Sequence, residues 1–170
     1  MTASVFVDTN ILLYAADARE PAKQAQAQAW IDHLWVERSG RTSMQVISEF
    51  YFNVKRAGRG VIDAGEAWDI AASYLAWSPQ VIDAALMRKA REIEGRWRLS
   101  WWDSLVVAAA QFQDCTLLLT EDLQDGAVFG GVTVRSPFKL DLHEPEATYA
   151  VTPATRARHR SRGRPARVPG

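Results

Sequence analysis

Four acidic residues stand out because they interrupt or end apolar segments in widely separated parts of the chain: Asp8, Glu49, Asp103 and Asp122. Asp8 follows a β-branched and aromatic run over residues 4–7, which predicts a buried strand that ends at this acid. In open α/β sheets, ligands bind at the carboxyl ends of strands. Asp8 or Asn10 could instead cap a helix that begins at Ile11. One cap does not explain four such acids, so we favour a shared chemical role.

Glu49 belongs to a polar stripe on a helix that we expect over residues 45–55. Gln45, Glu49 and Asn53 recur every four residues, and most of the residues between them are Val, Ile, Phe or Tyr. A helix that is apolar on most sides is mostly buried. Glu49 therefore lies either on a narrow solvent-facing stripe or against a polar pocket.

Asp103 stands at the start of a strongly apolar helix. Ser100, three residues earlier, fits a capping arrangement, which is the simplest structural explanation for this acid. Residues 104–110 are so apolar, however, that this helix should lie in the core and carry Asp103 with it. A buried carboxylate needs a partner, and a metal ion can satisfy several carboxylates together.

Asp122 follows a second strong strand, expected over residues 116–120, and a last strand is expected over 132–134. Further helices are expected over residues 22–37, 63–77 and 81–96. This order predicts an α/β fold with a mostly parallel central sheet flanked by helices on both faces. On such a sheet Asp8 and Asp122 meet at one edge, where the neighbouring helices can add Asp103 and Glu49.

Carboxylates gathered in this way repel one another, and a divalent cation relieves that repulsion. Oxygen ligands without a His or Cys cluster favour Mg²⁺, or Mn²⁺, over zinc. The three histidines are scattered along the chain. An Mg²⁺ site of this kind can activate a water molecule for attack on a phosphodiester.

The composition sets bounds on the kind of protein. With 170 residues, 48% of them hydrophobic and 24% charged, we expect one soluble domain, over residues 1–140. We find no signal peptide and no membrane span in the sequence, so we expect a cytoplasmic protein. The single cysteine, Cys115, is expected to be a small buried residue. Residues 151–170 carry six arginines and no acid, which predicts a disordered tail that either adds affinity for nucleic acid or has no role.

Four segments, in this order, resemble the acidic motifs of PIN-domain nucleases, and more narrowly those of VapC toxins from bacterial type II toxin–antitoxin pairs. They are Phe6-Val7-Asp8-Thr9-Asn10-Ile-Leu, Ser48-Glu49-Phe50, Trp102-Asp103-Ser-Leu-Val-Val-Ala-Ala and Leu119-Thr120-Glu-Asp122. Each motif alone is weak, but four in this order are specific, and the resemblance spans roughly residues 4 to 135.

The resemblance implies a PIN-like fold and an Mg²⁺-dependent RNA endonuclease. It implies a homodimer and a VapB-like antitoxin that blocks the pocket. Carried over to this chain, it makes Asp8 and Asp103 the principal metal ligands. Glu49 and Asp122 complete the acidic pocket, and the polar support comes from Thr9, Asn10 and Thr120. Many relatives carry a further acid two residues after the position of Asp122, but here that residue is Gln124, which leaves open whether Asp125 is a ligand.

Cations and aromatic residues alternate just before Asp103, as they do in proteins that bind single-stranded nucleic acid. We therefore expect Arg96, Arg98 and Trp101 to contact RNA, with a core or interface role as the alternative for the tryptophan.

Two other functions compete with a nuclease. An aspartate-dependent phosphatase would share Asp8, but haloacid-dehalogenase-like enzymes carry a second acid two residues later, where this chain has Asn10. A PIN-like module could also hold RNA or a partner protein without cutting. The presence of all four acids argues against such a module.

Overall fold

The computed structural model describes residues 2–56, 62–140 and 142. The sequence Gly58-Arg59-Gly60 predicts a turn, but this turn and the arginine-rich segment 151–170 lie outside the described residues. The domain boundary at residue 140 stays a prediction. Within the described part of the chain, none of the helices combines the length and the apolar character needed to cross a membrane.

A five-stranded sheet forms the centre of the molecule, in the order β2-β1-β3-β5-β4. The strands are β1 (Ser4–Val7), β2 (Gly40–Arg41), β3 (Cys115–Leu119), β4 (Val128–Phe129) and β5 (Val132–Arg135). All neighbouring pairs are parallel except β4 with β5. The mostly parallel sheet predicted from the sequence is thus confirmed, with one short antiparallel strand at its edge.

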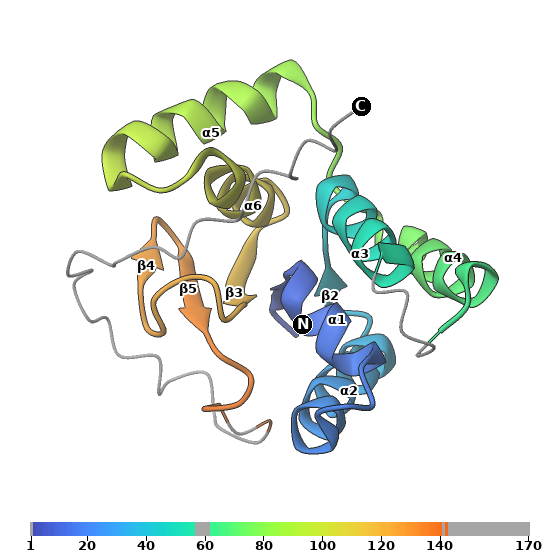
Figure 1. The fold of residues 1–170 in the computed structure, drawn as a ribbon. Helices are drawn as coiled ribbons and strands as arrows, with labels where there is room; N and C mark the ends of the chain where they lie inside the picture. The colour runs from blue at the N-terminus through green and yellow to red at the C-terminus, as the bar shows by residue number, and fades with distance from the viewer. Residues whose placement is uncertain (1, 57–61, 141, 143–170) are drawn as a thin grey trace.

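Helices cover both faces of this sheet. They are α1 (Thr9–Ala16), α2 (Pro21–Glu37), α3 (Met44–Arg56), α4 (Ala64–Ser73), the 3-10 helix η1 (Tyr74–Trp77), α5 (Ala84–Trp97) and α6 (Trp101–Phe112). In Figure 1, α5 and α6 lie above the sheet, α1 and α2 lie below it, and α3 and α4 lie beyond the β2 edge.

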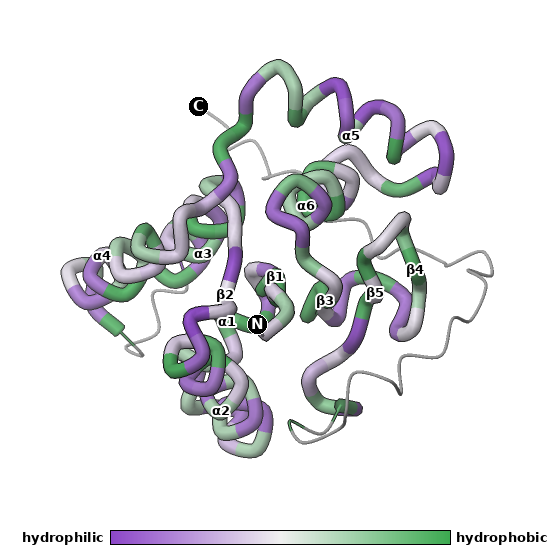
Figure 2. The backbone as a smooth tube through the Cα atoms, turned by 180° about the vertical axis from the view of Figure 1, so that it is seen from behind, coloured by the Kyte–Doolittle hydropathy of each residue, from purple (hydrophilic) through white to green (hydrophobic). Residues whose placement is uncertain are grey.

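The core follows from the apolar runs in the sequence. The central strands β1 and β3 and the helix α6 supply many of the buried side chains, and Leu105 to Ala110 are buried without a break. By contrast, α5 is amphipathic, so its tube in Figure 2 alternates between hydrophilic and hydrophobic segments. Cys115 is buried as predicted, and burial raises the pKa of its thiol to about 12.

The helix predicted over residues 81–96 begins later than expected, at Ala84. The side chain of Asp83 accepts a hydrogen bond from the backbone N–H of Leu86 at 2.8 Å, which caps the helix there. Val81 and Ile82 continue the apolar period of α5 in the sequence, but they belong to the connecting segment and are exposed. The sequence pattern places Ile82 on the apolar face of this helix, and the structure corrects that expectation, because neither residue packs in the core.

The connecting segment before α5 is attached to the start of α3. The backbone N–H of Gln80 donates to the carbonyl of Thr42 at 3.0 Å, and the N–H of Met44 donates to the carbonyl of Gln80 at 2.9 Å. These bonds form a parallel bridge between Ser43 and Gln80. The residues that follow Gln80 are thereby held beside the first turn of α3.

The short strand β2 depends on glycine at its first position. A Cβ atom on Gly40 would lie 2.6 to 2.7 Å from ring carbons of Trp77, which is buried. We predict that Gly40→Ala lowers the free energy of unfolding by about 1–3 kcal/mol because the ring has no room to move. Urea unfolding measures this loss. Gly131→Ala is the matched control, since its added Cβ meets nothing within 4 Å; equal midpoints for the two variants would contradict the prediction.

Candidate active site

The carboxyl ends of β1 and β3 bring two polar residues together. Val7 pairs with Leu119 across the two parallel strands, so the next residues, Asp8 and Thr120, lie side by side. The hydroxyl of Thr120 donates to Oδ2 of Asp8 at 2.8 Å. Asp8 is 1% exposed and Thr120 is 0% exposed. The first of the four acids is therefore buried at the sheet edge where the sequence predicted a site.

Asp8 also caps α1, which confirms the capping explanation, while its chemical role stays a prediction. Its Oδ1 accepts the backbone N–H of Thr9 at 2.8 Å, while Oδ2 accepts the hydroxyl of Thr120. The amide of Asn10 donates to the same Oδ2 at 3.4 Å and to the hydroxyl of Thr120 at 3.0 Å. One carboxylate thus fixes a helix start and joins two strand ends.

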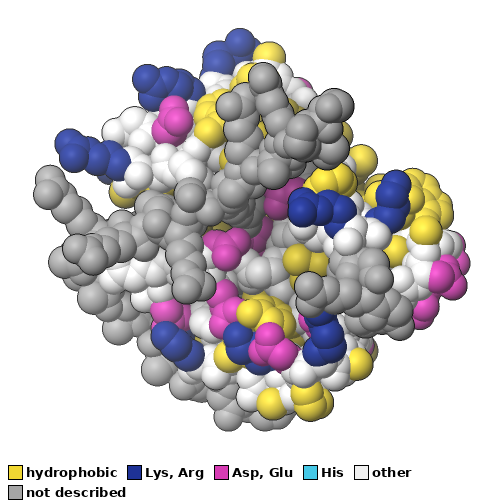
Figure 3. Space-filling view, viewed as in Figure 1, with side chains coloured by type: hydrophobic (Ala, Val, Ile, Leu, Met, Phe, Trp, Pro, Cys, Tyr) yellow, Lys and Arg dark blue, Asp and Glu magenta, His cyan; other side chains and the backbone are white. Residues whose placement is uncertain are grey.

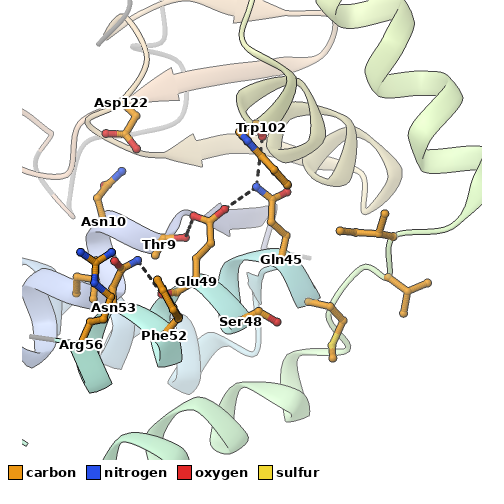
Figure 4. A pocket seen from close by; sticks show the side chains of 14 residues that line it. Thr9, Asn10, Gln45, Ser48, Glu49, Phe52, Asn53, Arg56, Trp102 and Asp122 are labelled. Atoms are coloured by element: carbon orange, nitrogen blue, oxygen red, sulfur yellow. Dashed lines mark hydrogen bonds between the residues drawn. The ribbon is translucent and has the colours of Figure 1, made fainter. Parts of the chain in front are cut away.

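The turn that carries Asp122 is bound to the same group of side chains. Oδ1 of Asn10 accepts the backbone N–H of Glu121 at 3.2 Å, and Oγ1 of Thr120 accepts the N–H of Asp122 at 3.0 Å. The supporting roles predicted for Asn10 and Thr120 therefore have a structural basis. Asp122 itself is exposed and lies at the rim of the pocket in Figure 4.

A lysine anchors this turn from the other side. Nζ of Lys23, on α2, lies 3.2 Å from a carboxylate oxygen of Glu121 and donates to the hydroxyl of Tyr14 at 3.1 Å. It also lies 5.0 Å from the ring centroid of Phe138. The hydrogen bond with Tyr14 raises the pKa of Lys23. The anchor holds the residue next to Asp122.

Glu49 faces a polar pocket rather than a solvent-facing stripe. Its carboxylate accepts the hydroxyl of Thr9 at 3.2 Å and the amide of Gln45 at 2.9 Å. The same amide nitrogen of Gln45 donates to the backbone carbonyl of Trp102 at 3.4 Å. The polar stripe of α3 thereby connects the start of α1 with the start of α6, as the dashed lines in Figure 4 show.

Asp103 is 2% exposed in the first turn of α6, as the apolar character of that helix predicted. The hydroxyl of Ser100 donates to Oδ2 of Asp103 at 2.7 Å and accepts the backbone N–H of Asp103 at 3.1 Å. This is the capping arrangement expected from the sequence. Because Asp103 follows Trp102, whose carbonyl is bound by Gln45, the turn that carries it borders Glu49.

These elements surround one cavity of about 670 Å³. Four of the predicted site residues line it, namely Thr9, Asn10, Glu49 and Asp122. Asp8 and Thr120 do not line the cavity, but both accept hydrogen bonds from the side chain of the lining residue Asn10. Asp103 directly follows the lining residue Trp102. In Figure 3, acidic side chains gather in the hollow at the centre of this face.

Several lining residues were not predicted as site residues: Leu13, Met44, Gln45, Ser48, Phe52, Asn53, Arg56, Val81, Ile82 and Trp102. Trp102, rather than Trp101, lines the cavity; Trp101 is half-buried and packs against the core. Successive residues of a helix point about 100° apart, so only one of the two can face the pocket. The sequence showed that the two tryptophans point in different directions, but only the rotation of α6 in the fold shows which of them faces the cavity.

Arg96 and Arg98 are exposed at the end of α5 and do not line the cavity. The guanidinium of Arg96 lies 4.7 Å from the ring centroid of Trp97. A contact between these arginines and RNA stays a prediction. Asp125 also lies outside the cavity lining, where its carboxylate accepts the backbone N–H of Ser136 at 2.7 Å and pairs with Arg135 at 3.3 Å.

The donor chemistry of the pocket fits a hard cation. In the described parts of the chain, no three His, Cys, Asp or Glu side chains form a ready-made metal cluster. Mg²⁺ does not require one, because it is commonly bound by one or two carboxylates together with waters and substrate phosphates. Glu49 and Asp122 in the wall, with Asp8 behind Asn10, offer oxygen donors of this kind.

The hydroxyl of Thr120 is the shared partner of three groups, since it donates to Asp8 and accepts from Asn10 and from the N–H of Asp122. We predict that Thr120→Val lowers the free energy of unfolding by about 1–3 kcal/mol, because valine keeps the shape but leaves buried polar groups without this partner. Thermal and urea unfolding measure the loss. Thr133→Val, on the half-buried face of β5, should change stability by less than about 0.5 kcal/mol. A neutral Thr120→Val would show that the network contributes nothing to the fold.

Comparison with known proteins identifies the fold. The chain is similar to VapC20 of Mycobacterium tuberculosis, a sarcin–ricin loop cleaving toxin, with a TM-score of 0.51 and 23% identity over 68% of this chain and 87% of that chain. It is also similar to a toxin–antitoxin complex from Klebsiella pneumoniae, with a TM-score of 0.53 and 20% identity over 79% of this chain and 98% of that chain. No curated protein matches significantly. The model of the PIN domain matches residues 5–124, which is most of the chain, and the chain therefore belongs to the PIN-domain family.

Proposed function

We propose that this protein is a metal-dependent endoribonuclease that hydrolyses phosphodiester bonds of single-stranded or structured RNA. The observation that carries the proposal is the convergence of four acid-bearing segments, from β1, α3, α6 and the turn after β3, on one hollow at the carboxyl edge of the sheet. Membership of the PIN-domain family supports it. The similarity to a toxin that cleaves the sarcin–ricin loop agrees with RNA as the substrate class.

Asp8 and Asp103 are the proposed principal ligands of Mg²⁺ or Mn²⁺, with Glu49 and Asp122 completing the pocket. When bound, the cation would activate a water molecule and neutralise charge on the phosphodiester. The surrounding residues hold the ligands in place before substrate arrives. Thr120 orients the carboxylate of Asp8, and Gln45 orients that of Glu49, so little reorganisation is needed on binding.

The carboxylates also explain why such a site would be silent without a cation. RNA phosphates and these acids carry charges of the same sign, which repel most strongly where solvent is excluded. Arg56 is the cationic residue among the lining side chains, and it lies at the side of the cavity formed by α3. We propose that it meets the RNA backbone outside the acidic part of the pocket.

As to partners, we propose that the protein is the toxin of a VapBC-like pair. A cognate VapB-like antitoxin would inhibit it by covering the pocket, and the protein would act in the cytoplasm as a homodimer. The similarity to a toxin–antitoxin complex supports an antitoxin partner.

The test is cleavage of single-stranded RNA by the purified chain, with Mg²⁺ and with EDTA. Cleavage is expected only with Mg²⁺, and Asp8→Asn should reduce it by about 100-fold or more, because an amide is a far poorer ligand for a hard cation. Asparagine caps helices as well as aspartate does, so the fold should persist in the variant, which circular dichroism measures.

The matched control for Asp8→Asn is Asp114→Asn. Asp114 precedes β3 at the opposite edge of the sheet and has a positive φ of 52°, a conformation that asparagine adopts readily. Its variant should cut RNA at the wild-type rate. Cleavage that persists in Asp8→Asn or in EDTA would overturn the proposal, and RNA binding without any cleavage would favour a non-catalytic module.

A further inference from the structure

One part of the cavity is apolar, which a role in binding a cation does not explain. Five large apolar side chains that line it are exposed by 37% to 52%: Met44, Phe52, Val81, Ile82 and Trp102. They come from α3, from the segment before α5 and from α6. Exposed apolar side chains that gather in a concave site indicate a ligand with an apolar surface.

Hydrogen bonds of the backbone hold the segments that carry this apolar wall. The bonds of Gln80 with Thr42 and Met44 fix the residues that follow Gln80 against α3. The carbonyl of Trp102 is bound by Gln45. The backbone on both sides of the wall is therefore held in place.

The wall adjoins the carboxylates directly. In Figure 4, Glu49 lies between Asn10 and Asp122 on one side and Gln45 and Trp102 on the other. In a polymer whose phosphates are linked by sugars that each carry a flat ring, a phosphate bound at the acids would place a neighbouring ring against this wall. RNA is such a polymer.

We propose that the apolar wall binds one unstacked nucleobase of single-stranded RNA, next to the phosphate that is cut, and that Trp102 stacks on it. The inference rests on the proposed function, because it names a subsite for the same RNA. A nucleobase is flat and uncharged, which suits an apolar wall of Trp102, Ile82 and Met44. The hydroxyl of Ser48 lines the same cavity and offers a polar contact to the edge of the base.

The size of the cavity favours a nucleotide over a protein segment. A volume of about 670 Å³ lies within the range of pockets for small molecules, about 300–1,000 Å³. A stable protein interface instead covers about 800 Å² on each partner, most of it outside a pocket of this kind. Arg56 lies at the same cavity, with its guanidinium 5.5 Å from the ring centroid of Phe52, where it can meet the phosphate that follows the bound base.

The experiment separates the base from the backbone. Labelled RNA octamers of random sequence are compared with octamers of the same length that lack every base, and binding to the Asp8→Asn protein is measured by fluorescence anisotropy in Mg²⁺. The complete octamer should bind about ten-fold or more tightly than the abasic one, as expected for stacking of one base. Adding Trp102→Ala should remove most of this difference and leave the affinity for the abasic octamer within about two-fold.

Three further variants keep the test sharp. Trp102→Phe retains a ring and should retain part of the preference for bases. Ile82 lies outside the helices and is 45% exposed, so Ile82→Ala should leave the core intact and weaken only the complete octamer. Trp68→Ala removes a tryptophan that is exposed on α4 outside the cavity, and it should behave as the parent does.

Equal binding of the two octamers to the parent, or equal effects of Trp102→Ala and Trp68→Ala, would overturn the subsite. A Trp102→Ala protein whose oligomeric state changes in sedimentation while its base preference persists would overturn it in favour of a protein contact. Cleavage by the chain without the Asp8 substitution is scored separately. If the unsubstituted chain cuts RNA but the Asp8→Asn protein shows no base preference, the subsite alone fails; if the Asp8→Asn protein shows the preference but the unsubstituted chain never cuts, the nuclease proposal alone fails.

Discussion

The structure of the site depends on the burial of one carboxylate between two parallel strands. Asp8 is almost fully buried, so its oxygens need partners that stay in place. The N–H of Thr9 and the hydroxyl of Thr120 provide them from α1 and from the end of β3. Because Thr120 and Asn10 also bind the turn that carries Asp122, the partners of the first acid position the last. A local need for satisfied polar groups thus organises residues more than a hundred positions apart.

Two of the four acids take part in helix caps. Asp8 caps α1 and Asp103 takes part in the cap of α6, so each is held by bonds that the helix would need in any case. Glu49 differs, because it lies in the middle of α3 and has no part in a helix cap. Its carboxylate is held by the side chains of Thr9 and Gln45. This explains why the sequence indicated a possible cap at Asp8 and at Asp103 but left two orientations open for Glu49. Only the packing of α3 against α1 decides between them.

What the sequence could predict followed from long apolar runs. The runs that became β1, β3 and α6 fixed the central sheet and its buried helix, and the acids at their ends came with them. The start of α5 could not be predicted in the same way, because Val81 and Ile82 continue its apolar period and only the cap at Asp83 ends it. The choice between Trp101 and Trp102 depended on the rotation of α6, which tertiary packing sets. The apolar part of the cavity arises from such choices, and it could not be foreseen.

The two parts of the cavity place opposite demands on whatever fills it. The carboxylates of Glu49 and Asp122 favour a cation and, through it, a phosphate, whereas the wall around Trp102 favours a flat group without charge. A free phosphate satisfies only the first demand and an apolar peptide only the second. A nucleotide satisfies both, because its linkage lets a phosphate and a base occupy neighbouring positions. With RNA as the proposed substrate, selectivity would then come from the distance between the two parts, which the bonds of Gln45 to Glu49 and to Trp102 hold fixed.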